Sequence, residues 1–175
     1  KQVGVATIIL EIKRLIDLVN ELLQVRQIQT GKFKFDMKKI NLSRITEKAI
    51  NNFEISNTQK SIKFKRTNDF ISICGDSNKI QQLIINLLNN AAKHSLDGKP
   101  IFVTLKENNE LITLSVKDQG VGIPKKEIPY IFNRFYKVNN NKKEGMGLGL
   151  YLVKKIIDAH NASIHVKSDI NKGTE

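Results

Sequence analysis

The chain has 175 residues, of which 40% are hydrophobic and 26% charged, so it can form one domain with its own core plus an extension. No run of about 18 apolar residues occurs, so no segment is expected to span a membrane, and the first residues do not have the pattern of a secretory leader. The single cysteine, Cys74, excludes an internal disulfide, and its place at the end of an apolar run predicts a buried thiol.

The net charge of +12 would suit a nucleic-acid-binding protein. However, the lysines are scattered along the chain and the few aromatic residues do not alternate with them, so no base-stacking platform is indicated. We therefore interpret the charge as a solvated lysine surface, part of which could attract phosphate, and expect no nucleic-acid partner.

The first expected element is one helix over residues 3–29, because apolar residues recur there every three or four positions. Gly31 is placed to end it, as a glycine just past a last helical turn does. The apolar stripe needs a partner, which a coiled coil or helical bundle with another chain would supply. Residues 32–37 alternate strictly between polar and apolar and predict a short strand.

Two further helices are expected in the middle of the chain. Asn41 or Ser43 can cap the first, which runs to about residue 57. Asp76 or Ser77 can cap the second, which is longer and reaches about His94.

Alternating polar and apolar residues predict strands in the rest of the chain. Two hairpins are expected, one joining 61–67 to 70–74 and the other joining 101–107 to 111–117, with a last strand at 163–168. Residues 118–147 show poor periodicity, and a loop of this length is typical of a functional segment. With a helix at 148–160, the pattern predicts an α+β fold, a two-layer α/β sandwich with a mixed sheet and helices on one face, preceded by one long N-terminal helix.

The helix over residues 79–94 has two chemically different faces. At 100° per residue, Asn86, Asn90 and Lys93 lie opposite its core face, which is formed by Ile80, Ile84, Leu87, Leu88 and Ala91. An Asn carbonyl is a hard oxygen ligand suited to Mg²⁺, and a Lys supplies a point charge for phosphate. Taken by itself, such a face could equally be a solvated surface.

Two glycine-containing segments follow. In the first, Asp118 ends a strand and can accept hydrogen bonds, while Gly120 and Gly122 allow the backbone to approach a ligand; an Asp-containing turn is the structural alternative. In the second, residues 145–150 open a helix whose free N–H groups and partial positive charge suit an anion. This second segment matches neither the dinucleotide-binding nor the Walker phosphate loop.

Taken together and in this order, these segments resemble the histidine kinase branch of the ATPase superfamily that also holds DNA gyrase, mismatch-repair ATPases and heat-shock chaperone ATPases. The resemblance rests on Asn-x3-Asn-x2-Lys, Asp-x-Gly-x-Gly-Ile-Pro, the loop residues 132–137 and Gly-x-Gly-Leu-Gly-Leu, and it runs from about residue 8 to residue 175. It implies that residues 1–31 are the second helix of a dimerisation and phosphotransfer hairpin, and that residues 32–175 are an ATP-binding catalytic domain with a lid over 123–146.

The resemblance also implies a function. The domain would bind ATP and Mg²⁺ and transfer the γ-phosphate to a histidine, for relay to the receiver domain of a response regulator. The intact protein would be a homodimer through the N-terminal helix. This region would be cytoplasmic, and membrane attachment of the parent protein stays open.

Each motif takes a role at the nucleotide under this resemblance. Asn90 would coordinate Mg²⁺, and Asn86 and Lys93 would lie near the phosphates. His94 would lie beside the nucleotide, and Asp118 would accept the adenine amino proton. A carboxylate there would face the carbonyl of guanine, and an unmet buried polar group costs about 1–3 kcal/mol, which is enough to select adenine.

The other implied positions lie in the glycine segments and the lid. Gly120 and Gly122 would let the base and ribose lie against the backbone, and Phe132 and Phe135 would anchor the lid to the core. The remaining implied ATP-binding residues are Ile123, the lid residues Arg134, Tyr136 and Lys137, the turn residues Gly145, Gly147, Leu148, Gly149 and Leu150, and Thr174 near the adenine.

Asn86 occupies the position where the gyrase and chaperone branch carries an acid that activates water. An amide cannot serve as a general base, so transfer to a protein acceptor is favoured over hydrolysis and would depend on positioning and charge stabilisation. The family's phosphate-accepting histidine lies on the first hairpin helix, and none of His94, His160 and His165 matches it. We therefore expect the chain to be part of a longer protein, and we expect that this part alone binds ATP but cannot phosphorylate itself.

Three alternatives stay open. A regulatory or scaffold module would bind nucleotide without transferring phosphate to a supplied hairpin. A motor-like ATPase would show substantial turnover without an acceptor, which Asn86 argues against. A DNA-binding protein would bind duplex DNA strongly at physiological salt.

Overall fold

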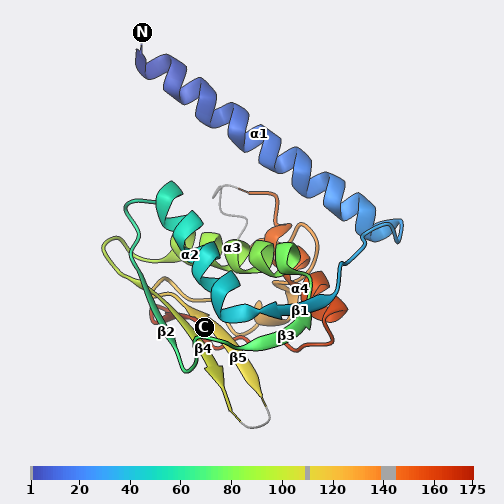
Figure 1. The fold of residues 1–175 in the computed structure, drawn as a ribbon. Helices are drawn as coiled ribbons and strands as arrows, with labels where there is room; N and C mark the ends of the chain where they lie inside the picture. Colours follow the sequence, from blue (N-terminus) through green and yellow to red (C-terminus); the bar gives the residue numbers. More distant parts are fainter. Residues whose placement is uncertain (1, 109–110, 139–144) are drawn as a thin grey trace.

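The computed structural model describes residues 2–108, 111–138 and 145–175, and places a long helix beside a layer of helices that covers one face of a mixed sheet (Figure 1). The α+β sandwich with a preceding helix is therefore confirmed. The elements in chain order are α1 (Gln2–Gln29), β1 (Lys38–Asn41), α2 (Leu42–Ser56), β2 (Ile62–Arg66), β3 (Ser72–Gly75), α3 (Ser77–His94), β4 (Ile101–Glu107), β5 (Ile112–Lys117), the 3-10 turn η1 (Ile128–Tyr130), α4 (Gly149–Ala159), β6 (Ser168–Asp169) and β7 (Gly173–Thr174).

Strand β4 is the centre of the main sheet. It pairs in parallel with β2 and antiparallel with β5, which confirms the predicted 101–117 hairpin, although its residues 109–110 lie outside the described part. Alternate side chains of β4, namely Ile101, Val103 and Leu105, are fully buried and join residues of α2 and α3 in one core. This core packs against one face of α3, and the opposite face of α3 carries the polar residues predicted above.

The predicted hairpin between 61–67 and 70–74 is wrong. Strand β3 pairs antiparallel with β1, with Lys39 opposite Cys74, while β2 pairs with β4. The intervening loop is held by the first turn of α2, where the Ser43 hydroxyl donates to the Asn68 carbonyl at 3.0 Å and accepts from the Ile71 N–H at 3.3 Å. These contacts between distant residues turn the chain away from β2, and alternation alone could not reveal them.

Two other strand predictions need correction. Residues 32–37 are not a strand, since β1 begins only at Lys38. The alternating residues Phe33 and Phe35 are half-buried, and their rings pack edge to face with 5.1 Å between the ring centres. Residues 163–167 are likewise outside a strand, and β6 is confined to Ser168–Asp169.

The prediction of a buried Cys74 is also wrong, because its side chain is exposed. Side chains of a strand alternate between two faces, so Ile71 is fully buried while Phe70 and Cys74 face solvent. The apolar run therefore lies across an edge ribbon and not inside the core.

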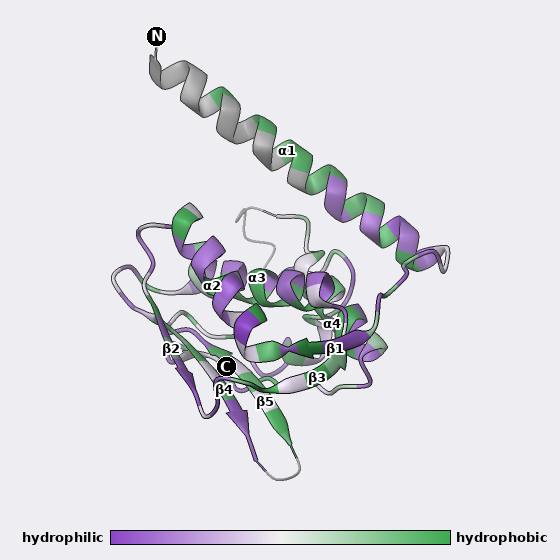
Figure 2. Cartoon of the chain, in the orientation of Figure 1, coloured by the Kyte–Doolittle hydropathy of each residue, from purple (hydrophilic) through white to green (hydrophobic). Residues whose placement is uncertain are grey.

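Helix α1 extends away from the domain over most of its length, and Figure 2 shows apolar positions recurring along its described part. It ends where predicted, with Gly31 at φ 65° and the N–H groups of Lys32 and Phe33 both donating to the Gln27 carbonyl. Near this end, Val25 is 3% exposed and packs with Leu148 and Leu152 of the domain. No helix in the described residues is long and apolar enough to cross a membrane.

Candidate functional site

Helix α3 presents its polar residues away from the core, as predicted. Its core residues Ile84 and Leu88 are fully buried, whereas Asn86 and Asn90 are half-buried and Lys93 is exposed. Core packing thus fixes the rotation of the helix and the direction of its polar face.

The glycine-rich turn before α4 lies directly against this polar face. The Asn86 side-chain amide donates to the Gly149 carbonyl at 3.4 Å. A Cβ added at Gly149 would lie 4.0 Å from both the Asn86 and the Asn90 carboxamides, and one added at Gly145 would lie 3.7 Å from the Lys93 ammonium nitrogen. The structure therefore brings together two motifs that are more than 50 residues apart in the sequence.

The N-terminus of α4 is open to an anion. Leu148 is its N-cap residue, and a leucine side chain has no oxygen that could accept from the first N–H groups of the helix. Such unpaired N–H groups and the positive end of the helix dipole suit phosphate. The Leu148 side chain is fully buried against Val25 and Leu152 and holds this turn in place.

Asp118 lies at the end of β5 and is only 7% exposed. Its Oδ1 accepts from the N–H of Gly120 at 2.8 Å and from the N–H of Thr174 at 3.2 Å, and these donors do not use Oδ2. Burial raises the pKa of the Asp118 carboxyl above its ordinary value of 3.8, and the two N–H donors oppose that rise. The carboxylate is thus a fixed, largely desolvated acceptor.

The two glycines after Asp118 serve packing within the protein. A Cβ at Gly120 would overlap the His94 carbonyl, and one at Gly122, where φ is 71°, would overlap the Asp169 carbonyl. Each glycine thus lets two backbone segments of the protein meet.

Thr174 is held beside Asp118 by a hydroxyl that the sequence did not single out. The Thr174 and Ser168 hydroxyls lie 2.8 Å apart, and Ser168 also accepts from the Ile123 N–H at 2.8 Å. Ser168 thereby ties the start of the lid to the chain end that contacts Asp118. No local sequence signal marked it, because a serine at the end of an expected strand is unremarkable by itself.

The expected lid, residues 123–146, is described up to residue 138 and again from residue 145. Phe135 does not anchor it to the core: it is 46% exposed with φ 64°, and the Arg134 guanidinium lies 4.4 Å from its ring centre. Among the described residues of this segment, the buried apolar side chain is that of Ile131, at 6% exposure. The lid instead meets the turn through the Phe135 N–H, which donates to the Gly147 carbonyl at 3.0 Å.

The lid residues expected near the nucleotide point to different partners here. The Tyr136 hydroxyl donates to the Glu127 carboxylate, a bond that raises the pKa of Tyr136 above its ordinary value. Arg134 and Lys137 are exposed.

Residues 75–175 match the family described as histidine kinase-, DNA gyrase B- and HSP90-like ATPase. The chain belongs to this family. It therefore carries an ATP-binding domain, and the matched region includes α3, Asp118 and the glycine turn of α4.

Relatives of known type agree with this family. The sensor histidine kinase WalK of Bacillus subtilis (strain 168) is 35% identical over 172 residues, which cover 94% of this chain and 28% of WalK. The sensor histidine kinase YkoH of the same organism is 35% identical over 160 residues, covering 90% of this chain and 34% of YkoH. The chain thus spans about a third of the length of these relatives.

Solved structures agree as well. The mycobacterial sensor histidine kinase MprB superposes with a TM-score of 0.71 at 25% identity, over 79% of this chain and 93% of that chain. The catalytic domain of histidine kinase ThkA superposes with a TM-score of 0.69 at 26% identity, over 79% of this chain and 91% of that chain. ThkA has also been solved in complex with response regulator protein TrrA.

The geometry of this ATPase domain suits a nucleotide with a bound metal ion. Within the described ranges, no group of three His, Cys, Asp or Glu residues could hold a metal. The glycines of the turn leave room beside Asn86, Asn90 and Lys93. Near Asp118, the buried Ser95 hydroxyl has no hydrogen-bond partner among the described residues, and Ser95 pairs with Gly120.

Proposed function

We propose that this chain is the ATP-binding catalytic region of a sensor histidine kinase, which transfers the γ-phosphate of MgATP to a histidine on another segment. The observation that carries the proposal is the contact of the Asn86, Asn90 and Lys93 face with the glycine turn. This contact combines an oxygen ligand, a cation and helix N–H groups at one place, and these are the groups that phosphoryl transfer needs.

Within this proposal, the residues divide between the two ends of the nucleotide. Asn90 holds Mg²⁺, while Asn86, Lys93 and the N–H groups of residues 147–150 bind the phosphates. Bound Mg²⁺ would neutralise charge on the phosphate oxygens. Lys93 and the α4 N-terminus would stabilise the additional charge that develops as the phosphoryl group leaves.

At the other end, Asp118 selects adenine. Its carboxylate accepts from the exocyclic amino group and would repel the carbonyl of guanine, because two acceptors would then face each other. Thr174 and Ile123 would border the base, and His94 would lie at its edge. Arg134, Tyr136 and Lys137 would reach the nucleotide after the lid moves from the position described here.

Asn86 favours transfer over hydrolysis. Its amide donates to the Gly149 carbonyl and cannot take a proton from water. Slow hydrolysis without an acceptor is therefore expected, and a histidine on another segment would receive the phosphoryl group.

The parts outside the ATP-binding domain follow from the same proposal. Residues 1–31 would be the second helix of the dimerisation and phosphotransfer hairpin, and α1 would pair with its counterpart in a homodimer. The relay partner would be the receiver domain of a response regulator, by analogy with ThkA and TrrA. A cytoplasmic location fits this role.

The proposal is tested first by calorimetric titration of MgATP, MgGTP and metal-free ATP into the chain. We expect Mg²⁺-dependent binding of ATP and at least about tenfold weaker binding of GTP, with Asn90→Ala reducing the Mg²⁺ dependence. Asn89→Ala is the matched control, because Asn89 lies on α3 but is not near Gly149.

Phosphate transfer is tested by adding the hairpin segment of a histidine kinase as a separate protein. Labelled phosphate on its histidine would support the kinase proposal. Tight MgATP binding with no transfer to any supplied hairpin would favour a regulatory or scaffold module instead, and fast turnover without an acceptor would indicate a hydrolase.

A further inference from the structure

The connector between α1 and β1, residues 30–37, is fastened to the start of α3. The Asp36 N–H donates to Asp76 Oδ2 at 2.9 Å, while Asp76 Oδ1 caps α3 by accepting from the N–H groups of Asn78 and Lys79 at 3.0 and 3.1 Å. Asp76 therefore joins the connector to the helix that carries Asn86 and Asn90.

His160, at the end of α4, holds Asp76 from the other side. The Asp76 N–H lies 2.9 Å from His160 Nε2, and His160 Nδ1 lies 2.7 Å from the Ile156 carbonyl oxygen. Because a backbone N–H only donates and a carbonyl only accepts, Nε2 must be the acceptor and Nδ1 must carry the proton. This arrangement assigns His160 as neutral.

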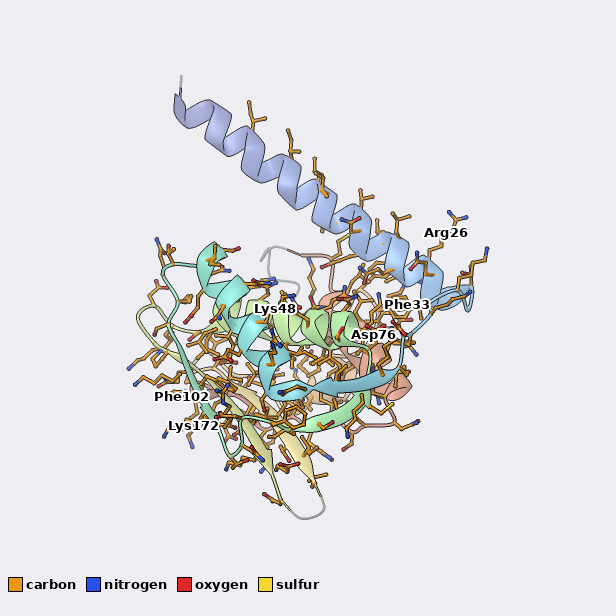
Figure 3. The ribbon with its side chains drawn as sticks, in the orientation of Figure 1. Arg26, Phe33, Lys48, Asp76, Phe102 and Lys172 are labelled. Carbon is orange, nitrogen blue, oxygen red and sulfur yellow. The ribbon has the colours of Figure 1, made fainter. Side chains whose placement is uncertain are left out.

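The His160 imidazole is closely packed, and this packing fixes the position of its ring beside Asp76. A Cβ added at Gly75 would lie 2.9 Å from His160 Cδ2, and the Phe35 ring meets the imidazole edge to face at 5.7 Å. Phe33 packs on Phe35, and the Lys79 ammonium lies 4.1 Å from the Phe33 ring centre. Figure 3 shows Phe33 and Asp76 at the same corner, below the end of α1.

We propose that His160 is a positioning residue: neutral His160, acting through Asp76, fixes the connector and thereby the direction of α1 against the ATP-binding domain, and its protonation releases the connector. The inference does not depend on phosphate transfer, because it concerns only the placement of α1. It adds an acid-sensitive junction to the domain.

The effect of protonation follows from the donor count. A proton on Nε2 would set it against the Asp76 N–H, so two donors would face each other at 2.9 Å. The imidazolium could regain an acceptor only by leaving the Asp76 N–H and moving toward the Asp76 carboxylate, which already accepts from the N–H groups of Asp36, Asn78 and Lys79. This movement would shift the Asp76 side chain and weaken its bond to the connector.

The charged groups around this junction come from three elements. They are Asp76 and Lys79 at the start of α3, Asp36 with its ion-pair partner Lys38 on the connector side, and Asp158 with its partner Lys154 on α4. Both Asp36 and Asp158 already have lysine partners, which leaves Asp76 as the carboxylate through which His160 acts.

The test measures the direction of α1 by the distance between two spin labels within one chain, one on the exposed native Cys74 and one on Asn20→Cys in α1. Labelled protein is diluted with an excess of unlabelled protein, so that distances between chains do not contribute. Two pH values, about 7.5 and about 5.5, bracket the range in which histidine side chains titrate. We expect a narrow distance distribution at the higher pH and a broad one at the lower pH. Amide exchange at Asp36 should become at least about tenfold less protected over the same change.

Two substitutions separate the proposal from a simple packing role. In His160→Gln the side-chain carbonyl can accept from Asp76 and does not titrate, so the distribution should stay narrow at both pH values. His160→Phe keeps a ring but has no hydrogen-bond acceptor, so its distance distribution should be broad at both pH values. His165→Gln, at an exposed histidine, should behave as the wild type.

A second label pair, Cys74 with Lys106→Cys in β4, reports on the domain alone and should not change. The proposal is overturned if the wild-type distribution and Asp36 protection are the same at both pH values. The proposal is equally overturned if the distance distribution of His160→Gln broadens at the lower pH as that of the wild type does, because the response would then belong to another group.

Discussion

Asp118 illustrates, at the scale of a single residue, how a functional group can oppose stability. Its carboxylate is 7% exposed, and burial raises its pKa above 3.8. Because the folded pKa exceeds the unfolded one, ionisation lowers the free energy of unfolding as pH rises through that interval. A buried charge of this kind is expected where a ligand needs it.

The first prediction is that Asp118→Asn lowers MgATP affinity by at least about tenfold, or about 1.4 kcal/mol, without lowering the free energy of unfolding. The amide oxygen can still accept from Gly120 and Thr174, but the amide nitrogen presents a donor to the adenine amino group. Calorimetry and urea denaturation measure the two quantities. Asp169→Asn, at an exposed position, is the control, and equal affinity in both variants would contradict the assignment.

The second prediction concerns pH. Since an ionised Asp118 is a stronger acceptor for the proposed adenine contact than a protonated one, and burial raises its pKa, ATP affinity should fall on acidification at a higher pH than for an ordinary aspartate. Titrations at several pH values with an adenosine ligand lacking phosphates isolate this effect from phosphate protonation. If adenosine affinity depends on pH in Asp118→Asn as steeply as in the wild type, the pH dependence does not come from Asp118.

At the scale of elements, α3 depends on its cap. Asp76 accepts from Asn78 and Lys79 within the first turn and from Asp36 in the connector. Desolvation raises the pKa of Asp76, but these N–H bonds outweigh it, so the pKa lies below its ordinary value of 3.8. A depressed folded pKa means that this stabilisation is present above 3.8 and is lost as pH falls through the folded value.

The third prediction is that Asp76→Ala lowers the free energy of unfolding by about 1–2 kcal/mol at neutral pH, while Asp76→Asn, which retains capping oxygen, costs less. The difference between the wild type and Asp76→Ala should shrink in acid below pH 3.8. Urea denaturation at neutral and acid pH measures both. Ser77→Ala, one position later and exposed, should have little effect.

The glycine turn is the second element whose geometry is demanding. Gly147 has φ 73°, and a Cβ there would lie 2.7 Å from the Tyr136 carbonyl. Its carbonyl also accepts from the Phe135 N–H. The turn thus requires glycine both for its conformation and for contact with the lid.

The fourth prediction is that Gly147→Ala costs about 1 kcal/mol or more of unfolding free energy from the positive φ alone, and also weakens MgATP binding by moving the lid. Gly98→Ala is a matched control for the conformational term, since Gly98 has φ 71° with nothing near its Cβ position. If both variants bind MgATP like the wild type, the turn does not contact the ligand.

At the scale of the whole molecule, α1 is a helix whose apolar side chains are largely not covered by the ATP-binding domain. Its exposed apolar residues are Ile8, Ile12, Leu15, Ile16, Val19, Leu22 and Leu23, each at least 41% exposed. Among the described contacts, the end of the helix is held by the Val25 cluster, by a 2.6 Å hydrogen bond from Gln82 to Gln24 and by the connector that follows it. A stripe of this kind favours association with another helix.

The fifth prediction is that the chain self-associates through α1, and that Leu15→Glu together with Val19→Glu makes it monomeric. Sedimentation over a range of concentrations measures this. Asn20→Glu adds a charge to the same helix at a polar exposed position and should leave association unchanged. A wild-type monomer at every concentration would rule out the pairing of α1.

Several features of this protein could be predicted from residues near each other in the chain. The caps Asn41 and Asp76, the end of α1 at Gly31 and the two faces of α3 follow from local hydrogen bonding and helical periodicity. The ordered motifs likewise predicted an ATP-binding domain of this family, because each motif has a fixed chemical role that needs particular residue types.

Only the tertiary structure decided which distant segments meet. Strand pairing of β1 with β3, exposure of Cys74 and the meeting of Asn86 with Gly149 depend on contacts across the fold. Alternation shows that one side of a segment is buried but does not identify its partner. The junction of Asp36, Asp76 and His160 has the same origin, since its hydrogen bonds join residues from three elements that no local pattern relates.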